Sequence, residues 1–207
     1  MSKTDFLFDG PDDGGLTVIL AHGAGAPMDS PFMARFAALL GNSGYRVARF
    51  EFPYMARRRA EGGRRPPDRQ PILLESWRAA VSALDGGDKV AIGGKSMGGR
   101  MASMIADEAG ARGLVCIGYP FHPPGKPESL RTAHLTTLKT PTLILQGERD
   151  PFGGRDEVAG YDLSPQIRLA WLPDGDHDLK PRKKSGFTAD GNMTAAVDAT
   201  AGFLAEL

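Results

Sequence analysis

The chain contains a single cysteine, Cys116, among its 207 residues, so it cannot form an intrachain disulfide. It has no continuous apolar run of about 18 residues, and the sequence therefore predicts no membrane-spanning helix. The opening residues also lack the apolar stretch of a secretory signal. We therefore expect a cytoplasmic protein that works in a reducing environment.

An excess of charge of either sign is also missing. Lys and Arg together number 25, as do Asp and Glu, so the formal net charge is zero. A chain without net charge has no overall field that would attract nucleic acid or an anionic membrane. We expect neither of these as a partner, and any function that depends on charge must come from a local group of residues.

Hydrophobic residues make up 41% of the chain and form short apolar runs that alternate with helical patterns. Runs that are apolar throughout are typical of strands covered on both faces. Their alternation with helices predicts an α/β fold, with helices on both faces of a mostly parallel sheet. Because no repeat or linker interrupts the pattern, we expect residues 1–207 to form one domain. The expected strands cover residues 16–21, 45–52, 89–93, 113–119, 142–146 and 166–172, the expected helices 30–40, 71–84, 97–108 and 192–207, and the expected long loops 53–69 and 120–129.

The most informative motif is a G-x-S-x-G sequence from Gly94 to Gly98, with Ser96 at its centre. It directly follows an expected strand and opens an expected helix, which is the setting of a nucleophile elbow. A serine on so sharp a turn needs neighbours without bulk two positions before and after it. The turn lifts the hydroxyl out of the sheet toward a substrate. The alternative is that the small residues only tighten a strand-to-helix turn.

A nucleophilic serine needs a base, and the base needs an acid that orients it. In proteins with a nucleophile elbow the chain order is serine, acid, histidine. Of the four histidines only His177 follows the last expected strand, and Asp150 follows the strand before it. The sequence therefore predicts Ser96, Asp150 and His177 as a catalytic triad. Glu148 and Asp156 are the nearest rival acids; alternatively, Asp150 only caps a turn and His177 is a solvated loop residue.

Backbone N–H groups are also needed to hold the oxyanion that forms during acyl transfer. Met97 follows the serine at a helix N-terminus, so its N–H is the first candidate donor. The loop after the first strong strand supplies the second, with Ala24 as the first choice and Gly25 as the next. His22 in the same loop is expected to be a structural hydrogen-bonding residue rather than a second base.

Six short segments carry a resemblance to a known family: His22-Gly-Ala-Gly-Ala26, Phe50-Glu-Phe-Pro-Tyr-Met55, Gly94-Lys-Ser-Met-Gly-Gly-Arg100, residues 118–126, Leu145-Gln-Gly-Glu-Arg-Asp150 and Asp174-Gly-Asp-His177. Together they resemble the KANL3/Tex30-type α/β-hydrolases, a group related to dienelactone-hydrolase-like proteins. The resemblance covers nearly the whole chain and implies an α/β-hydrolase fold without a lid domain. It implies no substrate. Few residues precede the first strong strand, so we expect the usual antiparallel edge strands to be mostly absent and the sheet to have about six strands.

Two loops and one lysine are candidates for substrate binding. Residues 57–69 hold six arginines, and we expect Arg57, Arg58 and Arg59 to flank the pocket and bind an acidic group. The alternative is a solvated surface loop. His122, in a proline-rich loop, and Lys95, beside the serine, are the other candidates. The alternatives are that the prolines only stiffen the His122 loop where it crosses the surface, and that the side chain of Lys95 faces solvent.

These patterns together predict a serine hydrolase that cleaves an ester, thioester or similar acyl bond in a small-molecule substrate, with a preference for small acidic substrates. They imply no metal and no organic cofactor. The alternative, from another class of function, is a binding or scaffold protein that kept the fold and lost turnover.

Overall fold

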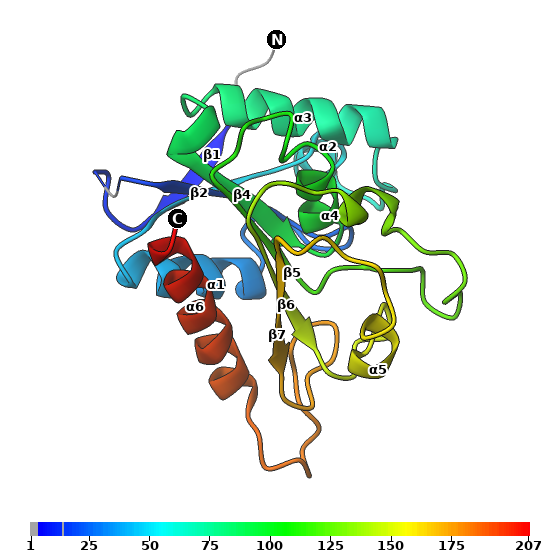
Figure 1. The fold of residues 1–207 in the computed structure, drawn as a ribbon. Coiled ribbons are helices and arrows are strands. Elements are labelled where there is room, and N and C mark those ends of the chain that lie inside the picture. Colours follow the sequence, from blue (N-terminus) through cyan, green and yellow to red (C-terminus); the bar gives the residue numbers. More distant parts are fainter. Residues whose placement is uncertain (1–3, 14) are drawn as a thin grey trace.

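The computed structural model describes residues 4–13 and 15–207. One seven-stranded sheet forms its centre, with helices packed on both faces (Figure 1). The strand order is β1-β3-β2-β4-β5-β6-β7, and all neighbours pair in parallel except β1, which is antiparallel to β3. The strands are β1 (Phe6–Asp9), β2 (Thr17–Ala21), β3 (Arg46–Phe50), β4 (Val90–Lys95), β5 (Gly113–Ile117), β6 (Thr142–Gly147) and β7 (Ile167–Leu172).

Two helical layers enclose the sheet. Helices α1 and α6 cover one face, and α3 and α4 cover the other. Strand β2 shows the division, because Val18 and Leu20 pack with α1 while Ile19 and Ala21 pack on the opposite side. No helix within the described residues is both long enough and apolar enough to cross a bilayer. The helices are α1 (Pro31–Asn42), α2 (Pro53–Glu61), α3 (Gln70–Ser82), α4 (Met97–Ser103), α5 (Arg155–Val158) and α6 (Ala189–Ala205).

The edge strand β1 differs from the sequence-based expectation. The sheet has seven strands, not about six, because residues 6–9 pair with β3 in the register Phe6↔Phe50. The ring of Phe6 packs edge-on against that of Phe50, with centroids 6.4 Å apart. Four residues are too few to show a strand pattern, and this strand depends on its pairing with β3, at residues 47–50.

The arginine-rich segment differs as well. Residues 53–69 were expected to be a loop, but Pro53–Glu61 form α2. Pro53 suits the first helical turn, where its missing N–H is no loss. Tyr54 and Met55 are buried and anchor the helix to the core. The sequence did not predict this helix, because the rest of the segment is polar. The expected helix over 97–108 is shorter, since α4 ends at Ser103.

The parallel strands bring the predicted site residues to one edge of the sheet. Ala24 follows β2, Ser96 follows β4, Asp150 follows β6 and His177 follows β7. In an open α/β sheet the loops beyond the carboxyl ends of the strands form the ligand-binding crevice. The site described below lies at this edge.

Candidate active site

Ser96 occupies a strained turn between β4 and α4. Its φ of 51° and ψ of −115° are rare for a residue with a side chain. The flanking glycines are required by the backbone of β2: a Cβ atom at Gly94 would stand 2.1 Å from the carbonyl oxygen of Ala21, and one at Gly98 would stand 2.4 Å from it. The turn therefore excludes side chains two residues on either side of the serine.

Ser96, His177 and Asp150 meet in a continuous chain of hydrogen bonds. The imidazole Nε2 of His177 lies 2.9 Å from Ser96 Oγ, and Nδ1 lies 2.8 Å from Asp150 Oδ2. A carboxylate accepts from Nδ1–H, which leaves Nε2 free to accept the serine proton. The ring of Phe152 packs on the imidazole with centroids 4.3 Å apart, and this contact limits its rotation.

The Asp150 carboxylate is buried and has a full set of donors. Besides His177, the side-chain Nε2 of Gln146 donates to Oδ2 at 3.0 Å, and the backbone N–H of Phe152 donates to Oδ1 at 2.9 Å. Gln146 is itself fixed by two hydrogen bonds with the backbone of Tyr119. These contacts hold the carboxylate oxygen against the imidazole.

The rival acids are engaged elsewhere. Glu148 accepts the backbone N–H of Asp174 at 2.9 Å and pairs with Arg155 at 2.6 Å. Asp156 is exposed on the short helix α5. Asp150 is therefore the carboxylate that meets the histidine.

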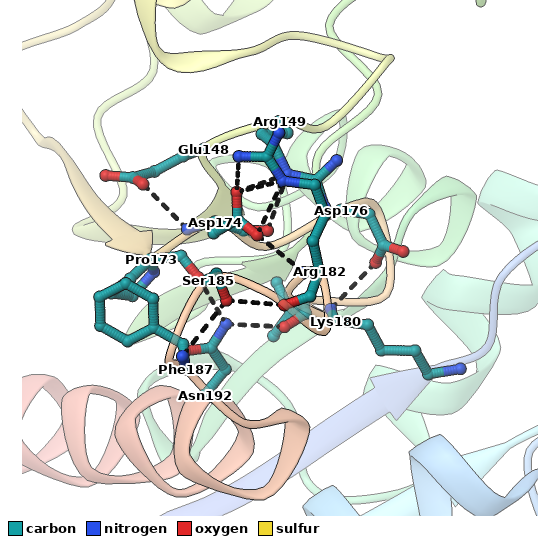
Figure 2. A network of polar contacts seen from close by, with 11 residues as sticks. Glu148, Arg149, Pro173, Asp174, Asp176, Lys180, Arg182, Ser185, Phe187 and Asn192 are labelled. Carbon is teal, nitrogen blue, oxygen red and sulfur yellow. Dashed lines mark hydrogen bonds and ion pairs between the residues drawn. The ribbon is translucent and has the colours of Figure 1, made fainter.

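The loop that carries His177 is held by a network around Asp174 (Figure 2). The buried Asp174 carboxylate binds the guanidinium groups of Arg182 and Arg149, and its backbone N–H donates to Glu148. The hydrogen bond from Arg182, with the positive charges of both arginines, lowers the pKa of Asp174 to about 2. Two cations and an acceptor thus fix the loop three residues before the histidine.

Further contacts in Figure 2 close the same loop on its other side. The side-chain amide of Asn192, on α6, donates to the carbonyls of Pro173 and Leu179 at 3.0 and 2.8 Å. The carboxylate of Asp176 accepts the backbone N–H of Lys180 at 2.9 Å. This supporting network was not predicted from the sequence, where the acidic residues Asp174, Asp176 and Asp178 ahead of Arg182 were the one available signal.

The predicted oxyanion donors come from the start of α4 and from the loop after β2. Met97 stands at the first position of α4, where a backbone N–H has no acceptor within the helix. In the loop after β2, the carbonyl of Ala24 accepts the Tyr54 hydroxyl at 2.9 Å, and the carbonyl of Gly25 lies 3.4 Å from Arg58. Ala24 and Gly25 both line the pocket that contains Ser96.

His22 has both ring nitrogens engaged. Nδ1 donates to the carbonyl of Gly23 at 2.7 Å, and Nε2 accepts the backbone N–H of Phe52 at 3.1 Å. Burial lowers the pKa of His22, so the neutral imidazole is favoured. The residue ties the loop after β2 to the segment after β3.

A pocket of about 320 Å³ opens at the serine and is large enough for a small ligand. Apolar side chains form part of its wall, and Lys95 and Asp178 supply charge beside the triad. The lining residues are Gly23, Ala24, Gly25, Ala26, Ser30, Phe32, Met33, Lys95, Ser96, Phe152, His177 and Asp178.

The predicted arginines are not part of this lining. Arg57 pairs with Asp68, and Arg59 pairs with Asp29 and Glu51. Both arginines instead border a separate cavity of about 960 Å³ beside α2 and α3. Arg58 reaches the pocket only indirectly, through the Gly25 carbonyl on its rim. The expectation that these side chains flank the pocket overlooked the acidic residues that neutralise Arg57 and Arg59.

The other two predicted substrate-binding residues have different surroundings. His122 is buried outside the pocket, where Nδ1 donates to the carbonyl of Pro123 at 2.8 Å and Nε2 lies 3.5 Å from Glu157. Lys95 does line the pocket and is only 7% exposed, so the solvent-facing alternative is wrong.

Ser103, the last residue of α4, makes a second hydroxyl–imidazole contact. Ser103 Oγ is 2.8 Å from His134 Nε2, but its own proton is donated to the carbonyl of Arg100 at 2.7 Å. Ser103 is buried, and within the described residues the His134 ring contacts Ser103 and Tyr119 but no carboxylate. This pair lacks the orienting acid and the access to substrate that Ser96 and His177 have. The described residues also contain no group of three or more His, Cys, Asp or Glu side chains placed to hold a metal ion.

Comparison with known proteins gives the same fold. The family described as "Alpha/beta hydrolase domain" matches residues 15–205. A serine hydrolase without a lid from Xanthomonas campestris superposes with a TM-score of 0.71 at 16% identity, covering 100% of this chain and 95% of the other. A dienelactone hydrolase from Anabaena variabilis superposes with a TM-score of 0.70 at 20% identity and 99% coverage of both chains. A serine hydrolase homologue from Coxiella burnetii gives 0.71 at 16% identity, covering 97% and 91%. The predicted fold class is confirmed.

Proposed function

Since the chain belongs to the alpha/beta hydrolase domain family, we propose that it is a serine hydrolase that cleaves an ester, thioester or similar acyl bond. In this proposal Ser96 is the nucleophile, His177 is the base, and Asp150 is the acid that orients the base. The six segments quoted above further support a place in the KANL3/Tex30-type group of that family.

The proposed reaction begins when Ser96 Oγ attacks the acyl carbonyl carbon and its proton passes to Nε2 of His177. Asp150 fixes the imidazole tautomer and stabilises the imidazolium that forms. The N–H groups of Met97 and of Ala24 or Gly25 hold the oxyanion of the intermediate. His177 then gives its proton to the leaving group. Water, activated by the same histidine, releases the acid from the acyl-enzyme.

The observation that carries the proposal is the pair of hydrogen bonds that links the three side chains. Both distances, 2.9 and 2.8 Å, are within the range needed for proton transfer and for orientation of the base. The strained conformation of Ser96 adds support, because backbone strain concentrates at functional sites.

The pocket supports a small substrate with an acidic group. Its volume of about 320 Å³ limits the size of the acyl group, and Lys95 is the cation in its wall. Rates measured on p-nitrophenyl esters of increasing chain length, and on matched esters with and without a terminal carboxylate, test both features. Equal rates on charged and uncharged esters would remove the acidic preference and leave the hydrolase proposal intact.

Fluorophosphonate labelling tests the proposed nucleophile. The folded protein is expected to react, and Ser96→Ala is expected to abolish the reaction. Ser103→Ala is the matched control, because it removes the other serine that contacts a histidine; this variant should label like the wild type. Absence of labelling in folded wild-type protein would favour the binding or scaffold alternative.

A further inference from the structure

Lys95 places a buried ammonium group beside the proposed base. It is the last residue of β4, and its Nζ donates to the backbone carbonyl of His177 at 2.7 Å across 82 positions of the chain. The Asp178 carboxylate lies 3.4 Å from the same nitrogen. Lysine is rarely buried without a partner, because removing its charge from water is costly. The two contacts, both to the histidine loop, provide that compensation.

Gly118 makes the space for this contact at the end of β5. A Cβ atom there would stand 2.9 Å from the His177 carbonyl oxygen, 3.2 Å from Lys95 Nζ and 3.3 Å from His177 Nδ1. The glycine also has a φ of +62°, which a side chain would strain. The lysine, the histidine backbone and the imidazole therefore meet around one position that must have no side chain.

We propose that Lys95 is a positioning residue for His177, a role that rests on the proposed function. Its ammonium holds the histidine backbone so that Nε2 remains at Ser96. Asp150 holds the other nitrogen of the ring, Nδ1. The lysine and the aspartate together fix the backbone and the ring of the base.

The electrostatic surroundings of Lys95 make this role dependent on pH. Burial lowers the pKa of Lys95, while the negative charges of Asp178, Asp150 and Asp176 act to raise it. The imidazole of His177 is a further titratable group that lies close to Lys95 Nζ in the described part of the chain. The net shift is downward, so at alkaline pH the ammonium loses its proton and its charge earlier than an exposed lysine would. We expect the activity of the wild type to fall there.

A role in substrate binding predicts a different result. A lysine that only binds a substrate carboxylate affects anionic substrates and leaves reactions with uncharged compounds unchanged. A lysine that positions the base affects both. An uncharged organophosphate, diethyl p-nitrophenyl phosphate, separates the two roles. Its reaction forms a bond from Ser96 Oγ to phosphorus, expels p-nitrophenolate and passes the serine proton to His177.

The experiment measures the rate of p-nitrophenolate release by the full-length protein from pH 5 to 10. Lys95→Met should slow the reaction on the order of tenfold to a hundredfold near pH 8, because small displacements of a catalytic group have effects of this size. The alkaline fall should disappear, since the variant has no ammonium to lose its proton there. Lys95→Arg, which keeps a charged donor, should recover part of the rate.

Matched variants separate the possible failures. Lys180→Met removes an exposed lysine from the same loop and should behave like the wild type. Lys95→Gln repeats the test if the methionine variant does not fold. An unchanged rate and profile in Lys95→Met or Lys95→Gln, or a slower rate with an unchanged profile, would overturn the positioning role. Reaction that persists in Ser96→Ala would instead refute the proposed function.

Discussion

Asp150→Asn replaces one oxygen of the buried carboxylate by an amide nitrogen and removes its charge. Both oxygens of Asp150 are acceptors: Oδ2 receives N–H groups from His177 and Gln146, and Oδ1 receives the N–H of Phe152. Wherever the new NH₂ group lies, it faces a donor. If it faces the imidazole, His177 must accept at Nδ1 and carry its proton on Nε2, and the histidine can then no longer accept the proton of Ser96.

The size of the effect follows from this change of tautomer. We expect kcat to fall on the order of 10⁴-fold, as in triads where the acid is replaced by its amide. This corresponds to a rise of about 5 kcal/mol in the activation free energy. Stability should fall by about 1–3 kcal/mol, because a buried donor is left without an acceptor.

The assay is the steady-state hydrolysis of a p-nitrophenyl ester, with the free energy of unfolding measured in urea alongside. Asp156→Asn is the matched control, since it removes an exposed carboxylate close in the chain and should leave kcat unchanged. A folded Asp150→Asn variant with kcat within about tenfold of the wild type would refute the assignment of the acid.

Two further predictions concern the backbone around the site. Gly98→Ala should lower the free energy of unfolding, measured in urea, by about 1–3 kcal/mol or more, because the new Cβ would collide with the Ala21 carbonyl. A Gly98→Ala variant as stable as the wild type would contradict the close contact between this turn and β2. Asp174 has its pKa lowered from 3.8 to about 2, so its carboxylate stabilises the fold above pH 3.8 and this contribution is lost as the pH falls toward 2. Thermal unfolding should show the wild type losing its advantage over Asp174→Asn across that interval, and a constant difference would contradict the ion-pair network.

The elements that local patterns encode were predictable from the sequence. The G-x-S-x-G motif identified the turn at Ser96, because the space around it admits only glycine at Gly94 and Gly98. Parallel strands bring their carboxyl ends to one edge, so chain order alone was enough to nominate Asp150 and His177 as neighbours of the serine. The apolar runs of the central strands also indicated that helices cover both faces of the sheet.

The parts that depend on distant contacts were not predictable. Strand β1 exists through its pairing with β3, and the charges of Arg57 and Arg59 are balanced by acids that fold against them. The sequence left Lys95 open between substrate binding and a solvent-facing side chain, because its partner, the His177 carbonyl, comes 82 positions later. A backbone carbonyl is present at every position, so no sequence pattern marks it as a partner.

Localising the covalent adduct tests the central claim most directly. After reaction with a fluorophosphonate, the intact mass of the protein should increase by one phosphonyl group, and tandem mass spectrometry of its peptides should place that group on Ser96. The Asp150→Asn variant should acquire it far more slowly. An adduct on another residue such as Ser103, or no adduct on folded protein, would contradict the account.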